Sequence, residues 1–188
     1  MAKTLKDVQS IKGVDLVIEV VDARAINTSS NPELTCNNHL PKLVVALKSD
    51  LSDLDVHDLD HDVLVGSIKD QSFRSRIVQA INVKLSDKMN RYKKKGLLTP
   101  QFNIMVVGLP NVGKSSLINF LAKRKVLIVE NRPGVTKNKQ LIKITDNYFI
   151  YDTPGVFVKK ITNDEDEYIL ALIGTVKKEV LPLNEVVQ

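Results

Sequence analysis

A lysine and a serine follow two spaced glycines in the second half of this 188-residue chain. Gly108 and Gly113 enclose four residues, and Lys114 and Ser115 come next, which is the spacing G-x-x-x-x-G-K-[ST]. Glycines let the backbone curl so that successive N–H groups point at phosphate oxygens. In such a loop the lysine reaches the β- and γ-phosphates, and the serine hydroxyl ligates Mg²⁺. The candidate nucleotide-binding residues of this loop are consecutive: Asn111, Val112, Gly113, Lys114, Ser115 and Ser116.

A second motif with phosphate chemistry lies downstream, in the sequence "DTPG" at 152–155. It has the D-x-x-G pattern, in which the aspartate holds Mg²⁺ through water and the glycine N–H senses the γ-phosphate. Thr136 lies between the two motifs, where a threonine closes on Mg²⁺ only when the γ-phosphate is present. We therefore assign catalytic roles to Lys114, Thr136 and Gly155, and we assign Mg²⁺ to Ser115, Thr136 and Asp152.

A GTPase also needs an element that reads the base, normally N-K-x-D after the D-x-x-G motif, and nothing after Gly155 fits it. Upstream, two apolar runs end in residues of suitable type. The candidate base-reading residues are Leu47, Lys48, Ser49 and Asp50 at the first tip, and Gly66 and Ser67 at the second, where a backbone N–H would meet guanine O6. The first half of the chain is therefore predicted to supply the base-reading part of the same site, in permuted order.

The strands and helices that position these residues can be predicted from the apolar runs in the sequence. Strands are predicted near 14–21, 42–48, 62–67, 102–108, 139–145 and 147–152. The stretch "SSLINFLAK" has helical spacing, which would place the phosphates at a helix N-terminus, and the acidic stretch 163–168 is expected to begin another helix. The predicted fold is an α/β three-layer sandwich of P-loop type, with a central, mostly parallel sheet and the ligand at the carboxyl ends of its strands.

Composition sets the outer bounds. A chain of this length with 43% hydrophobic residues suits one globular domain. The single cysteine, Cys36, excludes an intramolecular disulfide, and no apolar run reaches the length of a membrane span, so we expect a cytoplasmic protein without a membrane partner. The net charge of +5 permits a nucleic-acid partner without demonstrating one.

Taken in this order, the motifs resemble those of the circularly permuted GTPases, and most closely the ribosome biogenesis GTPase A family. The matching segments cover nearly the whole chain: "VDLVIEVVDAR", "SSNPEL", "LKSD", "GLPNVGKSSLIN", "NRPGVTK", "DTPGV" and "LALIGTVKKEVLPLNEV". The resemblance implies binding of GTP and GDP, GTP hydrolysis with Mg²⁺, and a role in late assembly of the large ribosomal subunit. We expect the protein to be a monomer.

One departure from the family lies in the base-reading motif, where Leu47 replaces the asparagine of N-K-x-D. That asparagine hydrogen-bonds guanine N7 and braces the phosphate loop, and a leucine can make neither hydrogen bond. Asp50 remains, and its carboxylate can accept from guanine N1–H and the exocyclic amine, donors that adenine lacks. We expect guanine preference to persist, with binding weakened by about 0.5–1.5 kcal/mol.

Members of this family carry a histidine, thought to orient the attacking water, in a segment ahead of the part that matches "MAKT", and they continue past "LPLNEV" into a small RNA-binding helical domain. We expect the chain to be a single G domain, made of a base-reading half 1–88, a linker 89–100, a phosphate-loop and switch half 101–176 and a tail 177–188. Its own histidines, His39, His57 and His61, read as surface residues.

Catalysis is expected to be slow. Val156 and Phe157 follow D-x-x-G, where many GTPases place a glutamine, so hydrolysis must rely on positioning and on the charges of Lys114 and Mg²⁺. In similar GTPases an asparagine at the place of Asn111 ligates K⁺, although a loop-capping role is an equal alternative here.

Two other functions stay open: a nucleotide-dependent binding module with negligible hydrolysis, and an NTPase of relaxed base specificity. The basic run 90–96 either faces solvent or contacts RNA phosphates.

Overall fold

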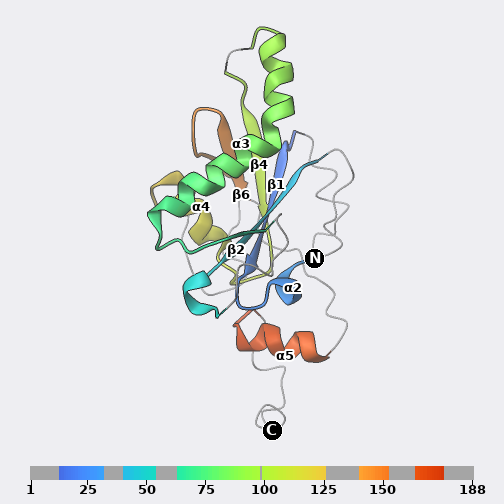
Figure 1. Ribbon diagram of the computed structural model, residues 1–188, viewed down its shortest axis with the longest axis vertical. Helices are drawn as coiled ribbons and strands as arrows, with labels where there is room; N and C mark the ends of the chain where they lie inside the picture. Colours follow the sequence, from blue (N-terminus) through green and yellow to red (C-terminus); the bar gives the residue numbers. More distant parts are fainter. Residues whose placement is uncertain are drawn as a thin grey trace.

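The computed structural model describes residues 13–31, 40–53, 63–97, 99–125, 140–152 and 164–175. Six strands form one sheet in the order β3-β2-β1-β4-β6-β5 (Figure 1). In chain order they are β1 Leu16–Asp22, β2 Lys42–Leu47, β3 Val63–Val65, β4 Phe102–Val107, β5 Gln140–Lys143 and β6 Tyr148–Asp152. These positions, and the α/β fold with a mostly parallel sheet, confirm what the apolar runs predict.

Neighbouring strands of the sheet pair in parallel except at one edge. β1 pairs with both β2 and β4, β2 pairs with β3, and β4 pairs with β6, all in parallel. The edge strand β5 runs antiparallel to β6. All seven residues of β1 are buried, as expected for a central strand of a parallel sheet, whose two faces are both covered.

The long helix α3 and the shorter helix α4 pack together on one face of the sheet. In α3 (Gln71–Lys94) the buried apolar residues recur every four positions: Phe73, Ile77, Ile81 and Leu85. They share one core cluster with buried residues of α4 (Lys114–Ala122). Arg74 of α3 joins the two helices, because its Nε donates to Leu121 O at 2.9 Å. The linker predicted over 89–100 therefore begins inside α3, which continues to Lys94.

The opposite face and the carboxyl end of the sheet carry shorter elements. Val21, Ala46 and Val65 alternate along their strands with residues of the main core and form a separate small cluster, against which Ile26 packs. Ile26 belongs to α2 (Ile26–Ser29), and α5 (Asp164–Leu172) lies beside α2, past the carboxyl end of β1 (Figure 1). Within the described ranges, none of the helices combines the length and the apolar character that crossing a bilayer would need.

Candidate functional site

The phosphate loop joins the end of β4 to the start of α4, as its sequence predicts. Its two glycines have positive φ values, +147° at Gly108 and +109° at Gly113. A β-carbon built on Gly108 would lie 2.3 Å from the carbonyl oxygen of Val20 on β1, so no larger residue fits there. The loop therefore begins tightly against β1 because its first residue is a glycine.

Lys114 is the first residue of α4, and its ammonium is turned back over the loop. Its Nζ donates to Gly108 O at 2.9 Å and to Leu109 O at 2.5 Å. Ser115 and Ser116 follow in the first turn of the helix, both half-buried. A cation, two hydroxyls and a helix N-terminus are thus gathered at one loop, and this combination suits an anion such as a phosphate chain.

The predicted base-reading residues come together at the carboxyl ends of the adjacent strands β2 and β3. Lys48 has a left-handed backbone with φ 66°, and the short 3₁₀ helix η2 (Ser49–Leu51) follows it. Two backbone hydrogen bonds join the strand ends: Gly66 N donates to Ala46 O at 3.0 Å, and Ser49 N donates to Gly66 O at 3.4 Å. The two segments that the sequence assigns to guanine recognition therefore lie side by side.

Asp50 projects from η2 and is held by two partners. Its Oδ2 lies 2.6 Å from Lys69 Nζ, and the pKa of its carboxyl is held below the usual range by hydrogen bonds from Lys69 and then from Ser67. The carboxylate is therefore ionised at neutral pH, as acceptance from guanine N1–H requires. The Lys69 side chain is 78% exposed, so a base can displace it at little cost.

Leu47, the last residue of β2, is buried, with 2% of its surface exposed. A β-carbon built on Gly113 would lie 3.0 Å from Leu47 Cδ1, so the leucine methyl group packs against the phosphate loop. Leu47, at the place of the asparagine in N-K-x-D, thus contacts the loop through dispersion alone, in agreement with the expectation that its side chain makes no hydrogen bond there.

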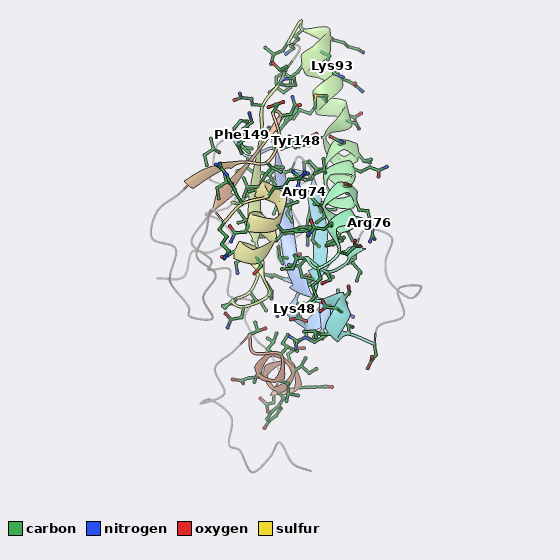
Figure 2. The ribbon with its side chains drawn as sticks, turned by 90° about the vertical axis from the view of Figure 1, so that its left-hand side faces the viewer. Lys48, Arg74, Arg76, Lys93, Tyr148 and Phe149 are labelled. Atoms are coloured by element: carbon green, nitrogen blue, oxygen red, sulfur yellow. The ribbon has the colours of Figure 1, made fainter. Side chains whose placement is uncertain are left out.

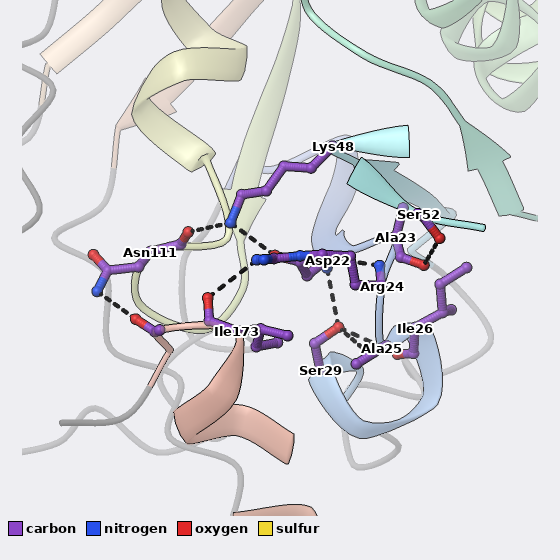
Figure 3. A network of polar contacts seen from close by, with 11 residues as sticks. Asp22, Ala23, Arg24, Ala25, Ile26, Ser29, Lys48, Ser52, Asn111 and Ile173 are labelled. Atoms are coloured by element: carbon purple, nitrogen blue, oxygen red, sulfur yellow. Dashed lines mark hydrogen bonds and ion pairs between the residues drawn. The ribbon is translucent and has the colours of Figure 1, made fainter. Parts of the chain in front are cut away.

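Asp22 also lies at this site, although its position in the sequence predicted no functional role for it. It ends β1, between β2 and β4, and its side chain is fully buried (Figure 3). Asp22 Oδ1 accepts from Arg24 Nε at 2.8 Å, and Oδ2 accepts from Lys48 Nζ at 2.7 Å. Burial raises the pKa of the Asp22 carboxyl, but the hydrogen bonds from Arg24 and Lys48 outweigh burial and hold the pKa below its usual range.

The same network reaches the phosphate loop and α5 (Figure 3). Lys48 Nζ also donates to Asn111 O at 2.9 Å, in the middle of the loop. Arg24 Nη2 donates to Ile173 O at 3.1 Å, and Asn111 Nδ2 donates to Gly174 O at 2.9 Å, so two side chains hold the end of α5 against the site. Sequence offered one signal for Asp22, an acidic residue directly after a buried run in "VVDAR".

Several predicted site residues fall outside what the structure describes. Thr136 and Gly155 lie outside the described residues, and Asp152 is described only as backbone at the end of β6. The three histidines, predicted to be surface residues, also lie outside the described residues. Among the described residues, no three of His, Cys, Asp and Glu are grouped closely enough to hold a metal ion. The roles assigned to Thr136, Asp152 and Gly155 stay predictions.

Residues 103–182 match a family described as "50S ribosome-binding GTPase". The chain is 40% identical over 189 residues to a probable ribosome biogenesis GTPase A of Mycoplasma pneumoniae, covering 99% of this chain and 69% of that protein. It is 34% identical over 200 residues to a ribosome biogenesis GTPase A of Priestia megaterium, covering 99% and 68%. A mitochondrial ribosome-associated GTPase 1 of Mus musculus is 36% identical over 197 residues, covering 94% and 59%.

Among solved structures, YlqF from T. maritima in its GNP-bound form has a TM-score of 0.64 to this chain at 22% identity, covering 96% of this chain and 69% of that one. Its GDP-bound form gives the same TM-score at 21% identity. These likenesses agree with the fold described above. The chain spans about two thirds of the length of the two bacterial ribosome biogenesis GTPase A relatives named above.

Proposed function

The chain belongs to the ribosome biogenesis GTPase A family, and we propose from that membership that it binds GTP and GDP, hydrolyses GTP slowly and acts in assembly of the large ribosomal subunit. The observation that carries the proposal is the meeting of two half-sites. The phosphate loop follows β4, and the base-reading residues follow β2 and β3. Both therefore lie at the carboxyl ends of the parallel strands, with the end of β1 between them. A nucleotide placed there can span both.

Mg²⁺ accompanies the nucleotide in P-loop GTPases, and the residues that the structure describes fit it. Ser115 supplies a hydroxyl oxygen one residue after Lys114, at the start of α4. Mg²⁺ prefers oxygen ligands and keeps several waters, so one hydroxyl together with phosphate oxygens suits it without a cluster of carboxylates. When bound, the ion would neutralise negative charge on the β- and γ-phosphates, and the ammonium of Lys114 would add a second positive charge beside the same phosphates.

We assign K⁺ to Asn111 as part of the proposal. The left-handed backbone at this residue, with φ 58°, turns its side chain toward the end of α5, where the amide nitrogen donates to Gly174 O. The amide oxygen is the type of atom that binds an alkali cation. The alternative, in which Asn111 only ties the loop to α5, predicts no response to K⁺.

Hydrolysis by this chain is expected to be slow in Na⁺ buffer and to rise in K⁺ buffer and with large ribosomal subunits. An arginine finger contributes roughly 10³–10⁵ in rate, and a cation in its place would stabilise the same transition-state charge. Phosphate release is measured in Na⁺ and K⁺ buffers of equal ionic strength, with and without subunits. Asn111→Gly keeps the positive φ, removes the amide and should abolish the K⁺ response.

Three results would count against this account. Fast turnover in Na⁺ alone would mean that the chain carries a further catalytic group that needs no K⁺. A K⁺ response that survives in Asn111→Gly would remove Asn111 from the cation site. Single-turnover assays that detect no hydrolysis with subunits present would favour a nucleotide-dependent binding module.

A relaxed base specificity is the second candidate function, and one observation favours it: Leu47 offers guanine N7 no hydrogen-bond donor. The position of Asp50 and its ionised state argue against relaxed base specificity.

The proposed cellular location is the cytoplasm, supported by the single cysteine, although proteins similar to this chain include mitochondrial ones.

The last turn of α3 is a candidate surface for contact with RNA of the ribosomal subunit. This turn carries Arg91, Lys93 and Lys94, all exposed, at the end of the helix that lies far from Lys48 (Figure 2). Tyr92 in the same turn is half-buried and packs against Phe102 of the core, with ring centroids 5.8 Å apart. If this basic end contacts RNA, it does so through charge, and the binding would weaken steeply with salt.

A further inference from the structure

Asp22 is an unusual choice for the end of a central strand, because its carboxylate is fully buried. A buried charge is tolerated only where partners satisfy it. Here two cations do so, with Arg24 Nη2 and Lys48 Nζ each 2.7 Å from Oδ2. The backbone N–H of Arg24 donates to Oδ1 as well, at 3.1 Å. The carboxylate is therefore fixed in place and can fix its partners in turn.

Lys48 needs such a partner. Lysine has a long flexible stem and a strongly hydrated ammonium, so its position is poorly defined unless an anion holds it. Its backbone is left-handed, a conformation that is uncommon for lysine and persists only where the surroundings impose it. Its Nζ lies between Asp22 Oδ2 and Asn111 O and donates a hydrogen bond to each. The side chain therefore connects the base-reading segment to the phosphate loop.

The hydrogen bonds made by Lys48 matter in this chain because the side chain of the preceding residue, Leu47, cannot hydrogen-bond the phosphate loop. The leucine packs against Gly113 but has no donor or acceptor with which to brace the phosphate loop. The hydrogen bond from Lys48 Nζ to Asn111 O supplies a polar connection between the base-reading segment and that loop. Asp22 is the anion that orients the ammonium for this connection.

We propose that Asp22 is a positioning residue of the nucleotide site: it holds Lys48 against the phosphate loop and so supplies the brace that Leu47 cannot. The inference rests on the proposed nucleotide binding. Arg24 extends the same arrangement to α5 through Ile173 O. A site whose two halves are already joined binds a ligand more tightly than one that must be ordered by the ligand.

The test compares Asp22→Asn with Lys48→Met, which keeps the stem and removes the ammonium. Each change is expected to weaken binding of a fluorescent GDP analogue about tenfold, the scale of one hydrogen bond to a charged group. Because the two changes break the same connection, the double variant should bind no more than about twofold more weakly than either single variant. Thermal melting of each variant is measured alongside.

The matched control is Asp15→Asn. Asp15 is also largely buried, and its side chain bonds Lys88 Nζ and accepts from Asn103 N at 2.7 Å, but it precedes β1, at the opposite end of that strand. This variant should lose thermal stability and keep wild-type affinity for GDP. A merely structural role for Asp22 would give the same pattern in Asp22→Asn.

The outcomes separate this inference from the proposed function. Wild-type protein that binds no GDP would overturn both, whereas wild-type binding with unchanged affinity in Asp22→Asn would overturn the positioning role alone. A loss of GDP affinity in the double variant equal to the product of the two single losses would also contradict it, because Asp22 and Lys48 would then act independently. If Asp22→Asn does not fold, Lys48→Met still decides: an affinity equal to that of wild type contradicts the proposal.

Discussion

Replacing Lys114 by alanine is expected to abolish detectable nucleotide binding while the fold is retained. The ammonium of Lys114 lies over the phosphate loop, held by the carbonyls of Gly108 and Leu109. Removing it deletes charge-assisted hydrogen bonds to the phosphates, each worth about 1.5–3 kcal/mol, so affinity should fall by about 100-fold or more. The helix keeps its core contacts, because Leu117, Ile118 and Leu121 are untouched.

Titration with a fluorescent GTP analogue and thermal melting together measure this result. Lys143→Ala is the matched control, since Lys143 is an exposed lysine on β5 whose ion pair with Asp146 is also exposed. The control should bind the analogue like wild type. Wild-type affinity in Lys114→Ala would mean that the loop does not hold the phosphates.

Asp50→Asn is expected to convert guanine preference into xanthine preference. The carboxylate can only accept, which matches the two donors of guanine, whereas an amide can also donate to the carbonyl that xanthine carries in place of the exocyclic amine. Two hydrogen bonds to an ionised acceptor are lost for GDP, so its binding should weaken by about 100-fold. Binding of the xanthine diphosphate should strengthen over the same titration.

Asp87→Asn serves as the control for this change, because Asp87 is an exposed carboxylate on α3, outside the segments assigned to the base. It should leave both affinities as they are in wild type. If the ratio of guanine to xanthine affinity is the same in Asp50→Asn as in wild type, the segment "LKSD" does not read the base.

Most strands of this fold could be predicted from sequence because they are short apolar runs; the antiparallel edge strand β5, with Gln140 and Lys143 at its ends, is the exception. A strand of a parallel sheet is covered on both faces, so it is apolar at nearly every position and stands out against polar loops. The predicted run 102–108 corresponds to Phe102–Val107, and the run 14–21 corresponds to Leu16–Asp22. The phosphate loop could be predicted for a different reason, since its chemistry requires a fixed spacing of glycine, lysine and serine.

The extent of α3 was harder to predict. The run "NRYKKKG" is polar and resembles a linker, yet the helix continues through it to Lys94. Gly96, with φ +82°, follows the last turn, and basic side chains there interact favourably with the carbonyl end of the helix dipole. Local composition therefore gave no sign that the helix projects so far.

The network around Asp22 could not be predicted from spacing, because its members come from distant parts of the chain. Lys48 lies 26 residues from Asp22, and Asn111 lies 63 residues from Lys48. Only the strand order, with β1 between β2 and β4, places their ends together. Sequence alone identified Lys48 and Asn111 as separate site residues and gave Asp22 no role.

We propose that both halves of the chain form one guanine-nucleotide site, and competition binding tests this most directly. Fluorescent GDP is bound to the wild-type chain in the presence of Mg²⁺ and displaced with unlabelled GDP or ADP. Because Asp50 can accept from N1–H and the amine of guanine, and adenine has neither donor, GDP should displace the probe at concentrations at least about 100-fold lower than ADP. Displacement by ADP at the same concentration as GDP would show that the residues after β2 and β3 do not read the base, and the account would be wrong.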